Sequence, residues 1–243
     1  MRSFFPIIYL FVYFTVALTV MLILLLIGLF NMNLRDKLSL LYVQLGLGGI
    51  FFFSGSNLNV VGLSNIPKDE AVMFVGNHIS YFDVIATYIL WSRPTGYISK
   101  KEIKKIPILN WLMYFVHCLF LDRNDPREGL KMVIKAAEMI QNGISIVIFP
   151  EGTRSKDGKL LEFKEGSFKI AAKAKCKIIP MGITGTPDIF ETHMPWLKPQ
   201  TVTIRFGKPI DTKDMDRQEL KKLPSIVRSE VAKLSGQEIA ESK

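Results

Sequence analysis

The apolar residues of this chain gather in one long run at its beginning and in short runs afterwards. Residues 3–34 contain no charged side chain, and the segment from Ile7 to Phe30 is almost wholly apolar. A helix needs about 20 such residues to cross a bilayer. The run is too long for the apolar core of a signal peptide, and no small-x-small cleavage site follows it. We therefore expect a membrane helix here, in preference to the buried helix of a soluble protein.

A second apolar stretch, from Leu38 to Phe53, is interrupted by Gln44 and by glycines that favour close helix packing or a break. The polar segment 31–37 separates the two stretches and predicts a turn. The positive charges of Arg35 and Lys37 argue against translocation of this turn across the membrane. We expect an N-terminal membrane-embedded two-helix hairpin over residues 1–56, with both ends on the cytoplasmic side. Crossing the bilayer and dipping into one leaflet both remain open.

From residue 57 to 243, short apolar runs alternate with helical patterns. The expected strands cover 71–76, 96–98, 119–121, 145–149, 178–184 and 201–206, the last with the alternation of a half-buried edge. The expected helices cover 84–90, 108–116, 126–141, 165–176 and a tail helical on either side of Pro224. Asp125, Pro126 and Glu128 predict a capped start for the third helix, and Gly143 predicts its end. This order predicts an α/β domain with a mainly parallel sheet flanked by helices.

Composition agrees with a membrane-attached chain of basic charge. Apolar residues make up 49% of the 243 residues, and the mean hydropathy is +0.24. The net charge is +9, from 31 basic and 22 acidic side chains. Such a surface suits anionic lipid headgroups, phosphate-bearing substrates or an acidic carrier protein, although most lysines fit an ordinary solvated helix face. No recognition-helix, zinc-finger or aromatic single-strand pattern supports nucleic acid as a partner.

Metal and nucleotide sites are not indicated. Cys118 and Cys176 stand in apolar or basic surroundings and are expected to be reduced and structural. Neither His117 nor His193 has a partner at metal-ligand spacing. Neither nucleotide-binding glycine motif is present. We expect no metal and no cofactor.

The segment from Asn77 to Asp83 lies between a predicted buried strand and a predicted helix. The segment lies at the carboxyl end of the predicted strand, and open α/β sheets bind their ligands at the edge where these strand ends lie. The turn brings His78 and Asp83 together as a base and its orienting carboxylate. The simpler interpretation is that Ser80 and Asp83 form a capping box with Asp in place of Glu. Residues 77–83 alone leave both interpretations open.

A second motif follows the strand 145–149, in the sequence Phe149 to Ser155, which reads F-P-E-G-T-R-S. Together with H-x-x-x-x-D from His78 to Asp83, it resembles the glycerophospholipid acyltransferase family, which includes the 1-acylglycerol-3-phosphate acyltransferases. Weaker family blocks are matched by Leu121-Asp122-Arg123 and by Ile179 to Gly182. The resemblance covers roughly residues 60–210. The ordered set of motifs is far more specific than H-x-x-x-x-D alone.

The resemblance implies transfer of an acyl group from a thioester to the sn-2 hydroxyl of lysophosphatidic acid, which yields phosphatidic acid. His78 would be the general base and Asp83 would orient its ring, with no covalent acyl-enzyme. Arg154 and Arg123 would bind the phosphate, because a guanidinium can contact two of its oxygens at once. Lys105 is a weaker third candidate. Glu151 and Gly152 would line the glycerol site.

Several alternatives remain open at this stage. Arg123 and Arg154 also fit ordinary ion pairs with Asp122, Asp125 or Glu151. The donor is acyl-CoA or acyl carrier protein, and the acceptor is lysophosphatidic acid, glycerol 3-phosphate or another lysophospholipid. A membrane-attached hydrolase is disfavoured because no G-x-S-x-G motif is present. A non-catalytic lipid-binding protein is the third class. We expect the chain at the cell membrane among its phospholipids, with the catalytic domain on the cytoplasmic side.

Overall fold

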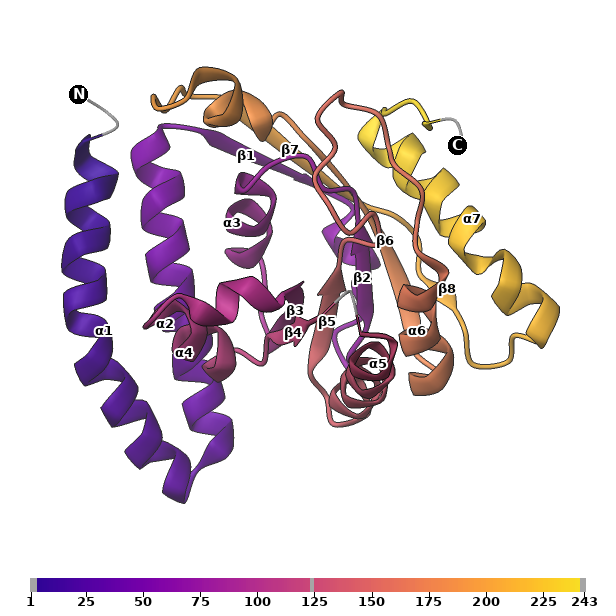
Figure 1. Ribbon diagram of the computed structural model, residues 1–243, viewed down its shortest axis with the longest axis horizontal. Helices are drawn as coiled ribbons and strands as arrows, with labels where there is room; N and C mark the ends of the chain where they lie inside the picture. Colours follow the sequence, from indigo (N-terminus) through magenta and orange to yellow (C-terminus); the bar gives the residue numbers. More distant parts are fainter. Residues whose placement is uncertain (1–3, 123–124, 241–243) are drawn as a thin grey trace.

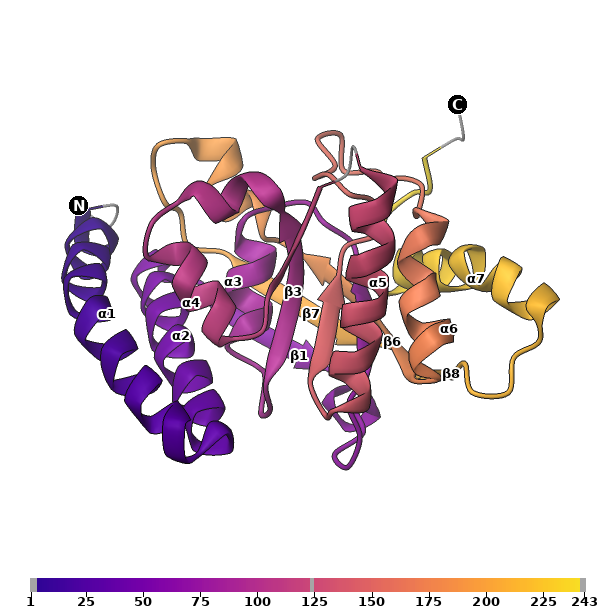
Figure 2. The ribbon, with the colours of Figure 1, turned by 60° about the horizontal axis from the view of Figure 1, so that its bottom comes forward.

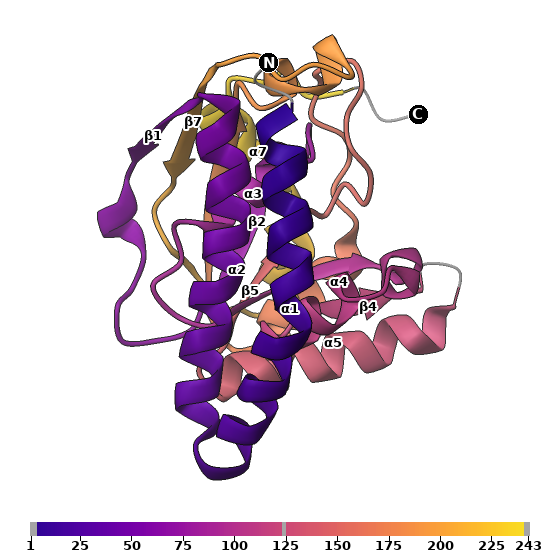
Figure 3. The same cartoon turned by 90° about the vertical axis from the view of Figure 1, so that its left-hand side faces the viewer.

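The N-terminal fifth of the chain is a helical hairpin. The computed structural model describes residues 4–122 and 125–240. In it, α1 (Phe4–Phe30) and α2 (Met32–Ser54) lie side by side (Figure 3). Both helices are long and apolar enough to cross a membrane, and most of α1 is exposed. The predicted hairpin is therefore present, and the division of the chain at residue 56 stays a prediction.

The turn of the hairpin is shorter than the seven polar residues that we expected. Only Asn31 separates the helices, and its side chain accepts a hydrogen bond from the backbone N–H of Leu34 at 3.0 Å. Because this cap starts α2 at once, Arg35 and Lys37 belong to its first turns. Gly46 and Gly49 lie where any side chain would overlap the rings of Tyr13 and Tyr9, so these glycines permit close packing and do not break α2.

An eight-stranded sheet forms the centre of the remaining chain (Figure 1). Its order is β1-β7-β6-β2-β5-β3-β4, with β8 paired to β6. All pairs are parallel except β6 with β7 and β6 with β8. The predicted α/β class with a mainly parallel sheet is confirmed. The strands are β1 (Asn57–Val61), β2 (Met73–Gly76), β3 (Thr95–Lys100), β4 (Leu119–Leu121), β5 (Ser145–Ile148), β6 (Lys177–Thr184), β7 (Thr201–Phe206) and β8 (Ile210–Asp211).

One edge of the sheet differs from the sequence-based expectation. We expected β7 at the edge, but β1 pairs with it in parallel and takes that place. The alternation along β7 remains real, since its residues are buried at every second position. β1 was not predicted because its sequence, Asn57-Leu58-Asn59-Val60-Val61, is short and half polar. Such a composition suits a half-covered edge strand.

Helices cover both faces of the sheet (Figure 2). Alternate residues of a strand point to opposite faces. Met73 and Val75 pack with α5 (Pro126–Gln141), α6 (Lys169–Ala174) and α7 (Arg217–Ser235). Val72 and Phe74 pack with α3 (Phe82–Tyr88) and with α2. The remaining short helices are η1 (Leu63–Asn65), η2 (Lys101–Lys105), α4 (Leu109–Phe115), η3 (Glu165–Phe168), η4 (Pro187–Ile189) and η5 (Glu191–His193).

Helix ends and lengths follow local chemistry, with exceptions. The side chain of Asp125 caps α5 as predicted, but Glu128 pairs with Lys131 at 2.8 Å and does not complete a reciprocal cap. The helix expected over 165–176 is a 3-10 turn followed by the shorter α6. Pro224 does not divide the tail helix as expected. A proline inside a helix costs about 3 kcal/mol. Three fully buried side chains of α7 offset that cost by anchoring the helix on the sheet: Leu223, Val227 and Val231.

Candidate active site

The segment of residues 77–83, here called the His78 turn, connects β2 to α3 at the carboxyl edge of the parallel strands. Its first residue, Asn77, is completely buried. The Asn77 amide donates to the carbonyl of Ile183 at 2.9 Å and accepts from the N–H of Ile183 at 2.8 Å. These two bonds fix the start of the turn to the neighbouring strand β6.

Asp83 holds the imidazole of His78. Its Oδ2 lies 2.8 Å from His78 Nδ1 and also accepts the N–H groups of Ile79 and Ser80 at 2.7 and 2.8 Å. Its Oδ1 accepts the hydroxyl of Thr186 at 2.6 Å. A carboxylate that accepts from Nδ1 assigns the proton to that nitrogen and leaves a lone pair on Nε2. The two interpretations of the motif hold together, because Asp83 binds both the backbone of the turn and the ring.

The imidazole of His78 is partly accessible. Its side chain is 21% exposed, whereas that of Asp83 is completely buried. The Phe149 ring stacks on the imidazole with a centroid separation of 4.4 Å and an angle of 12° between the planes. Among the described residues, Nε2 of His78 makes no hydrogen bond. The ring is therefore fixed in position and tautomer, with one basic nitrogen free to act.

Residues 149–155, here called the arginine strap, follow β5 and lie against the His78 turn. Gly152 has a φ of 75°, which a residue with a side chain rarely adopts, and its N–H donates to the carbonyl of Phe149 at 3.1 Å. The N–H of Ser155 donates to the carbonyl of His78 at 2.8 Å. The tight turn at Gly152 thus brings the strap back onto the backbone of the histidine.

Glu151 of the strap is buried, with only 4% of its surface exposed. Its Oε1 accepts the N–H of His78 at 2.6 Å, and its Oε2 accepts the N–H of Leu161 at 3.0 Å. Burial raises the pKa of Glu151 to about 7. Glu151 therefore joins the backbone of His78 to the backbone of Leu161. The expected contact of Glu151 and Gly152 with glycerol stays a prediction.

Arg154 extends from the strap beside the His78 turn. Its guanidinium carbon lies 3.6 Å from the centroid of the Tyr81 ring, and its Nη1 lies 3.3 Å from Oε1 of Glu191. The ion pair considered for Arg154 therefore exists, but with a different partner from Glu151. The side chain of Arg154 is 33% exposed, so part of this cation remains accessible.

Glu191 and Thr186 are site residues that the sequence analysis missed. Glu191 accepts the hydroxyl of Ser80 at 2.8 Å and the N–H of Tyr81 at 2.7 Å, in addition to its ion pair with Arg154. Both residues lie more than 100 positions after the His78 turn. No local motif marks them, because the fold of the segment after β6 alone brings them to the site.

One of the remaining predicted phosphate ligands, Lys105, stands apart from this cluster. Lys105 ends η2, which follows β3 at the same sheet edge, and β5 lies between β3 and β2. Lys105 is exposed and makes no hydrogen bond or ion pair with the described residues. Arg123 lies outside the described residues. The structure thus brings His78, Asp83, Glu151, Gly152 and Arg154 together, while Lys105 lies farther along the edge.

The other titratable groups do not form a metal centre in the part of the chain that the structure describes. Cys118 and Cys176 are both free and buried. Burial raises the pKa of Cys118 to about 11 and that of Cys176 to about 12. Both side chains therefore remain protonated thiols packed in the interior, as the sequence predicted.

Comparisons with known proteins agree on one family. Residues 57–184 match the sequence model of the acyltransferase family. The chloroplastic 1-acyl-sn-glycerol-3-phosphate acyltransferase LPAT1 of Arabidopsis thaliana is 38% identical over 136 residues, which are 56% of this chain and only 38% of that protein. The 1-acyl-sn-glycerol-3-phosphate acyltransferase of Borreliella burgdorferi is 30% identical over 182 residues, 75% of this chain and 73% of that protein.

A solved structure resembles the whole chain. The crystal structure of the 1-acyl-sn-glycerophosphate (LPA) acyltransferase PlsC from Thermotoga maritima aligns over 100% of both chains, with a TM-score of 0.74 and 27% identity. The likeness includes the N-terminal hairpin, since the alignment covers all of the chain. The sequence and the structure of this chain are therefore both similar to those of proteins named as 1-acylglycerol-phosphate acyltransferases.

Proposed function

This chain belongs to the acyltransferase family, and from that membership we propose that it acylates the free sn-2 hydroxyl of 1-acylglycerol 3-phosphate. The acyl donor is a thioester, and the product is phosphatidic acid, a precursor of phospholipids. The observation that carries this proposal is the pair of His78 and Asp83, 2.8 Å apart, with Nε2 free and with the accessible Arg154 against Tyr81 of the same turn. Relatives whose names specify this reaction support the choice of acceptor.

His78 acts as the general base. A lipid hydroxyl is a poor nucleophile, so Nε2 accepts its proton as the oxygen attacks the thioester carbonyl. The oxygen–carbon bond forms, the carbon–sulfur bond breaks, and the proton passes from the imidazolium to the leaving sulfur. Asp83 stabilises the imidazolium, and Phe149 keeps the ring in its plane. The acceptor itself is the nucleophile, so Ser80, whose hydroxyl binds Glu191, has no covalent part.

Arg154 binds the phosphate of the acceptor. Its present partner Glu191 is 3.3 Å away, a loose contact for an ion pair. The phosphate offers two oxygens to the guanidinium and replaces this contact. Lys105 adds positive charge farther along the same edge, and Arg123 stays a second candidate ligand of the phosphate from the sequence motif alone. Glu151 supports the backbone of His78, and Gly152 gives the strap the tight turn that lets glycerol approach.

The hairpin keeps this site at the bilayer. Acceptor and product both carry long chains, and each buried methylene favours the membrane by about 0.8 kcal/mol. A site attached to the bilayer takes its acceptor from the interface without extracting it into water. The length and exposed apolar surface of α1 support this attachment. We place the protein at the cell membrane with its catalytic domain on the cytoplasmic side.

Product analysis in vesicles tests the function. The full chain is given lysophosphatidic acid with acyl-CoA in one arm and with acyl carrier protein thioester in another. Phosphatidic acid in either arm is the expected result, and the more productive arm identifies the donor. Free fatty acid without phosphatidic acid would indicate a hydrolase that activates water at His78. Absence of turnover in both arms would leave only lipid binding, and either result would overturn the proposal.

A further inference from the structure

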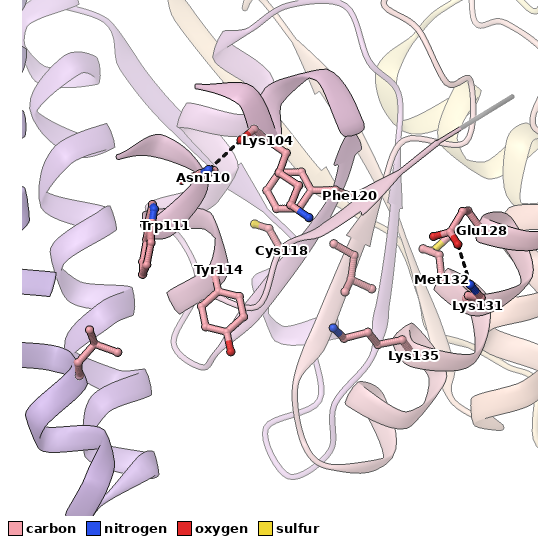
Figure 4. A pocket seen from close by; sticks show the side chains of 12 residues that line it. Lys104, Asn110, Trp111, Tyr114, Cys118, Phe120, Glu128, Lys131, Met132 and Lys135 are labelled. Carbon is pink, nitrogen blue, oxygen red and sulfur yellow. Dashed lines mark hydrogen bonds and ion pairs between the residues drawn. The ribbon is translucent and has the colours of Figure 1, made fainter. Parts of the chain in front are cut away.

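A cavity of about 780 Å³ lies at the opposite edge of the sheet from β1, between the hairpin and α5 (Figure 4). Its walls come from α1, η2, α4, β4 and α5. Neither the His78 turn nor the arginine strap contributes a lining residue. The cavity is within the usual size range of ligand sites, about 300–1,000 Å³. It is therefore a second candidate site, apart from the acyltransferase chemistry.

One wall of the cavity is apolar and continues the surface of the hairpin. It is formed by Leu25 of α1 and by Trp111 and Tyr114 of α4, which are 46%, 52% and 66% exposed. A buried cluster joins the two helices: Met21, Leu24, Leu112 and Phe115. Because α4 packs directly on α1, its aromatic side chains extend the apolar face that α1 exposes. Trp and Tyr are typical of the boundary between membrane and water.

The opposite rim of the cavity is basic. Lys131 and Lys135 of α5 line it together with one acidic side chain, Glu128, and a third lysine of the lining, Lys104 of η2, lies beside Asn110 (Figure 4). Glu128 is paired with Lys131 at 2.8 Å, and Lys135 makes no hydrogen bond or ion pair with any described residue. Figure 4 shows Lys135 extending from α5 into the space that faces Tyr114. The cavity therefore offers an excess of positive charge opposite an apolar wall.

We propose that this cavity binds an anionic diacyl phospholipid of the surrounding bilayer. The phosphate lies among Lys104, Lys131 and Lys135, and the acyl chains pass over Trp111 and Tyr114 onto the exposed face of α1. Charge complementarity selects an anionic headgroup, since each lysine near a membrane surface favours the binding of anionic lipid. Continuity with α1 selects a lipid over an acidic protein, which cannot follow the apolar wall into the bilayer. The bound lipid attaches the sheet edge to the membrane in addition to the hairpin.

Tryptophan fluorescence tests this site directly. In a Trp196→Phe background only Trp91, which is 5% exposed, and Trp111 remain. The full chain is reconstituted in phosphatidylcholine vesicles that contain a small fraction of brominated phosphatidylglycerol or of brominated phosphatidylcholine. Phosphatidylglycerol is neither acceptor nor product of the proposed reaction. We expect brominated phosphatidylglycerol to quench Trp111 more strongly than brominated phosphatidylcholine at equal fraction.

The lysines of the rim are then removed. Lys131→Gln with Lys135→Gln should lower the preference for phosphatidylglycerol by about fivefold per lysine. The matched control, Lys221→Gln with Lys222→Gln, changes two exposed lysines of α7, on the far side of the molecule from α1 (Figure 1). It should leave the preference unchanged. Circular dichroism confirms that each variant is folded. Equal quenching by both lipids in the parent chain, or equal losses in the two double variants, would overturn the proposal.

Discussion

The His78 turn and the arginine strap meet at one site but are held in very different ways. Asp83 is completely buried and accepts hydrogen bonds from four donors, which fix both of its oxygens. Arg154 is 33% exposed, and its ion pair with Glu191 is 3.3 Å long. The first group cannot move without breaking the turn. The second can exchange its partner at little cost, because a partly exposed ion pair contributes about 0–1 kcal/mol.

This difference corresponds to two tasks. A general base must be in position and in the correct tautomer before the acceptor arrives, so its contacts are short and shielded from water. A phosphate ligand must release one partner and take another at each turnover. The contrast predicts that changes in the His78 turn reduce the rate of the chemical step. It also predicts that changes around Arg154 reduce the affinity for the phosphate-bearing acceptor.

The largest effect is expected from His78→Ala. Removing the imidazole removes the base, and we expect kcat to decrease by about 10³–10⁴. The assay measures phosphatidic acid formed from lysophosphatidic acid and an acyl thioester. Circular dichroism and vesicle flotation should show normal folding and membrane attachment. A variant that is folded and retains a substantial fraction of the rate would exclude His78 as the base.

Asp83→Asn should have the next largest effect. The amide can donate to the ring and so favour the tautomer whose proton is on Nε2, which cannot act as a base. We expect kcat to decrease by about 10²–10³ while KM for the acceptor stays close to that of the parent. A rise in KM with an unchanged kcat would place Asp83 in acceptor binding.

Glu151 should make stability depend on pH. Its pKa rises from 4.5 to about 7 on folding, because burial disfavours the charged carboxylate. Between these two pH values the folded chain keeps a proton that the unfolded chain releases. The contribution of protonated Glu151 to the free energy of unfolding is complete below pH 4.5 and is lost as the pH rises through about 7, with a magnitude of roughly 3 kcal/mol.

Denaturant unfolding in detergent micelles at pH 5 and pH 8 measures this contribution. The parent chain should have the larger free energy of unfolding at pH 5, and Glu151→Gln should lack most of the difference. The control, Glu138→Gln, changes an exposed residue of α5 and should keep the full difference in stability between pH 5 and pH 8. A Glu151→Gln chain with the full pH dependence of the parent would show that another group is responsible.

The smallest effect is expected from Glu191→Gln. The amide can still accept the N–H of Tyr81 or the hydroxyl of Ser80, but it no longer attracts Arg154. We expect a change of severalfold or less in KM for lysophosphatidic acid, since the ion pair is worth about 0–1 kcal/mol. A loss of kcat as large as that of Asp83→Asn would show that Glu191 supports the base and not the phosphate ligand.

The chemistry of the site was predictable where the residues are close in sequence. Strand, turn and helix patterns around His78 and Asp83 placed the two on one turn, and the 2.8 Å contact confirms their approach. Phe149 was part of the second motif, but its stacking on the imidazole was not foreseen. A contact between rings on the segments that follow β2 and β5 depends on strand order, which local patterns do not specify.

Contacts across long sequence separations were not predictable. Thr186 and Glu191 complete the site from the segment that follows β6, and a single sequence contains no sign of that approach. The expectation that β7 forms the edge of the sheet was wrong for the same reason. Alternating burial shows that a strand is half covered, but it does not show which strand lies beside it. The N-terminal hairpin needed no such information, since its length and apolarity are local.

The division of tasks between the two regions is tested most directly with a pair of acceptors. The measurement is kcat/KM for lysophosphatidic acid and for monoacylglycerol, which lacks the phosphate, in the parent chain, His78→Ala and Arg154→Lys. The base acts on the hydroxyl of either acceptor, so His78→Ala should reduce both values alike. Arg154→Lys should reduce only the value for lysophosphatidic acid, by about tenfold or more. Equal losses for both acceptors in Arg154→Lys, or near-normal transfer by His78→Ala, would contradict the account.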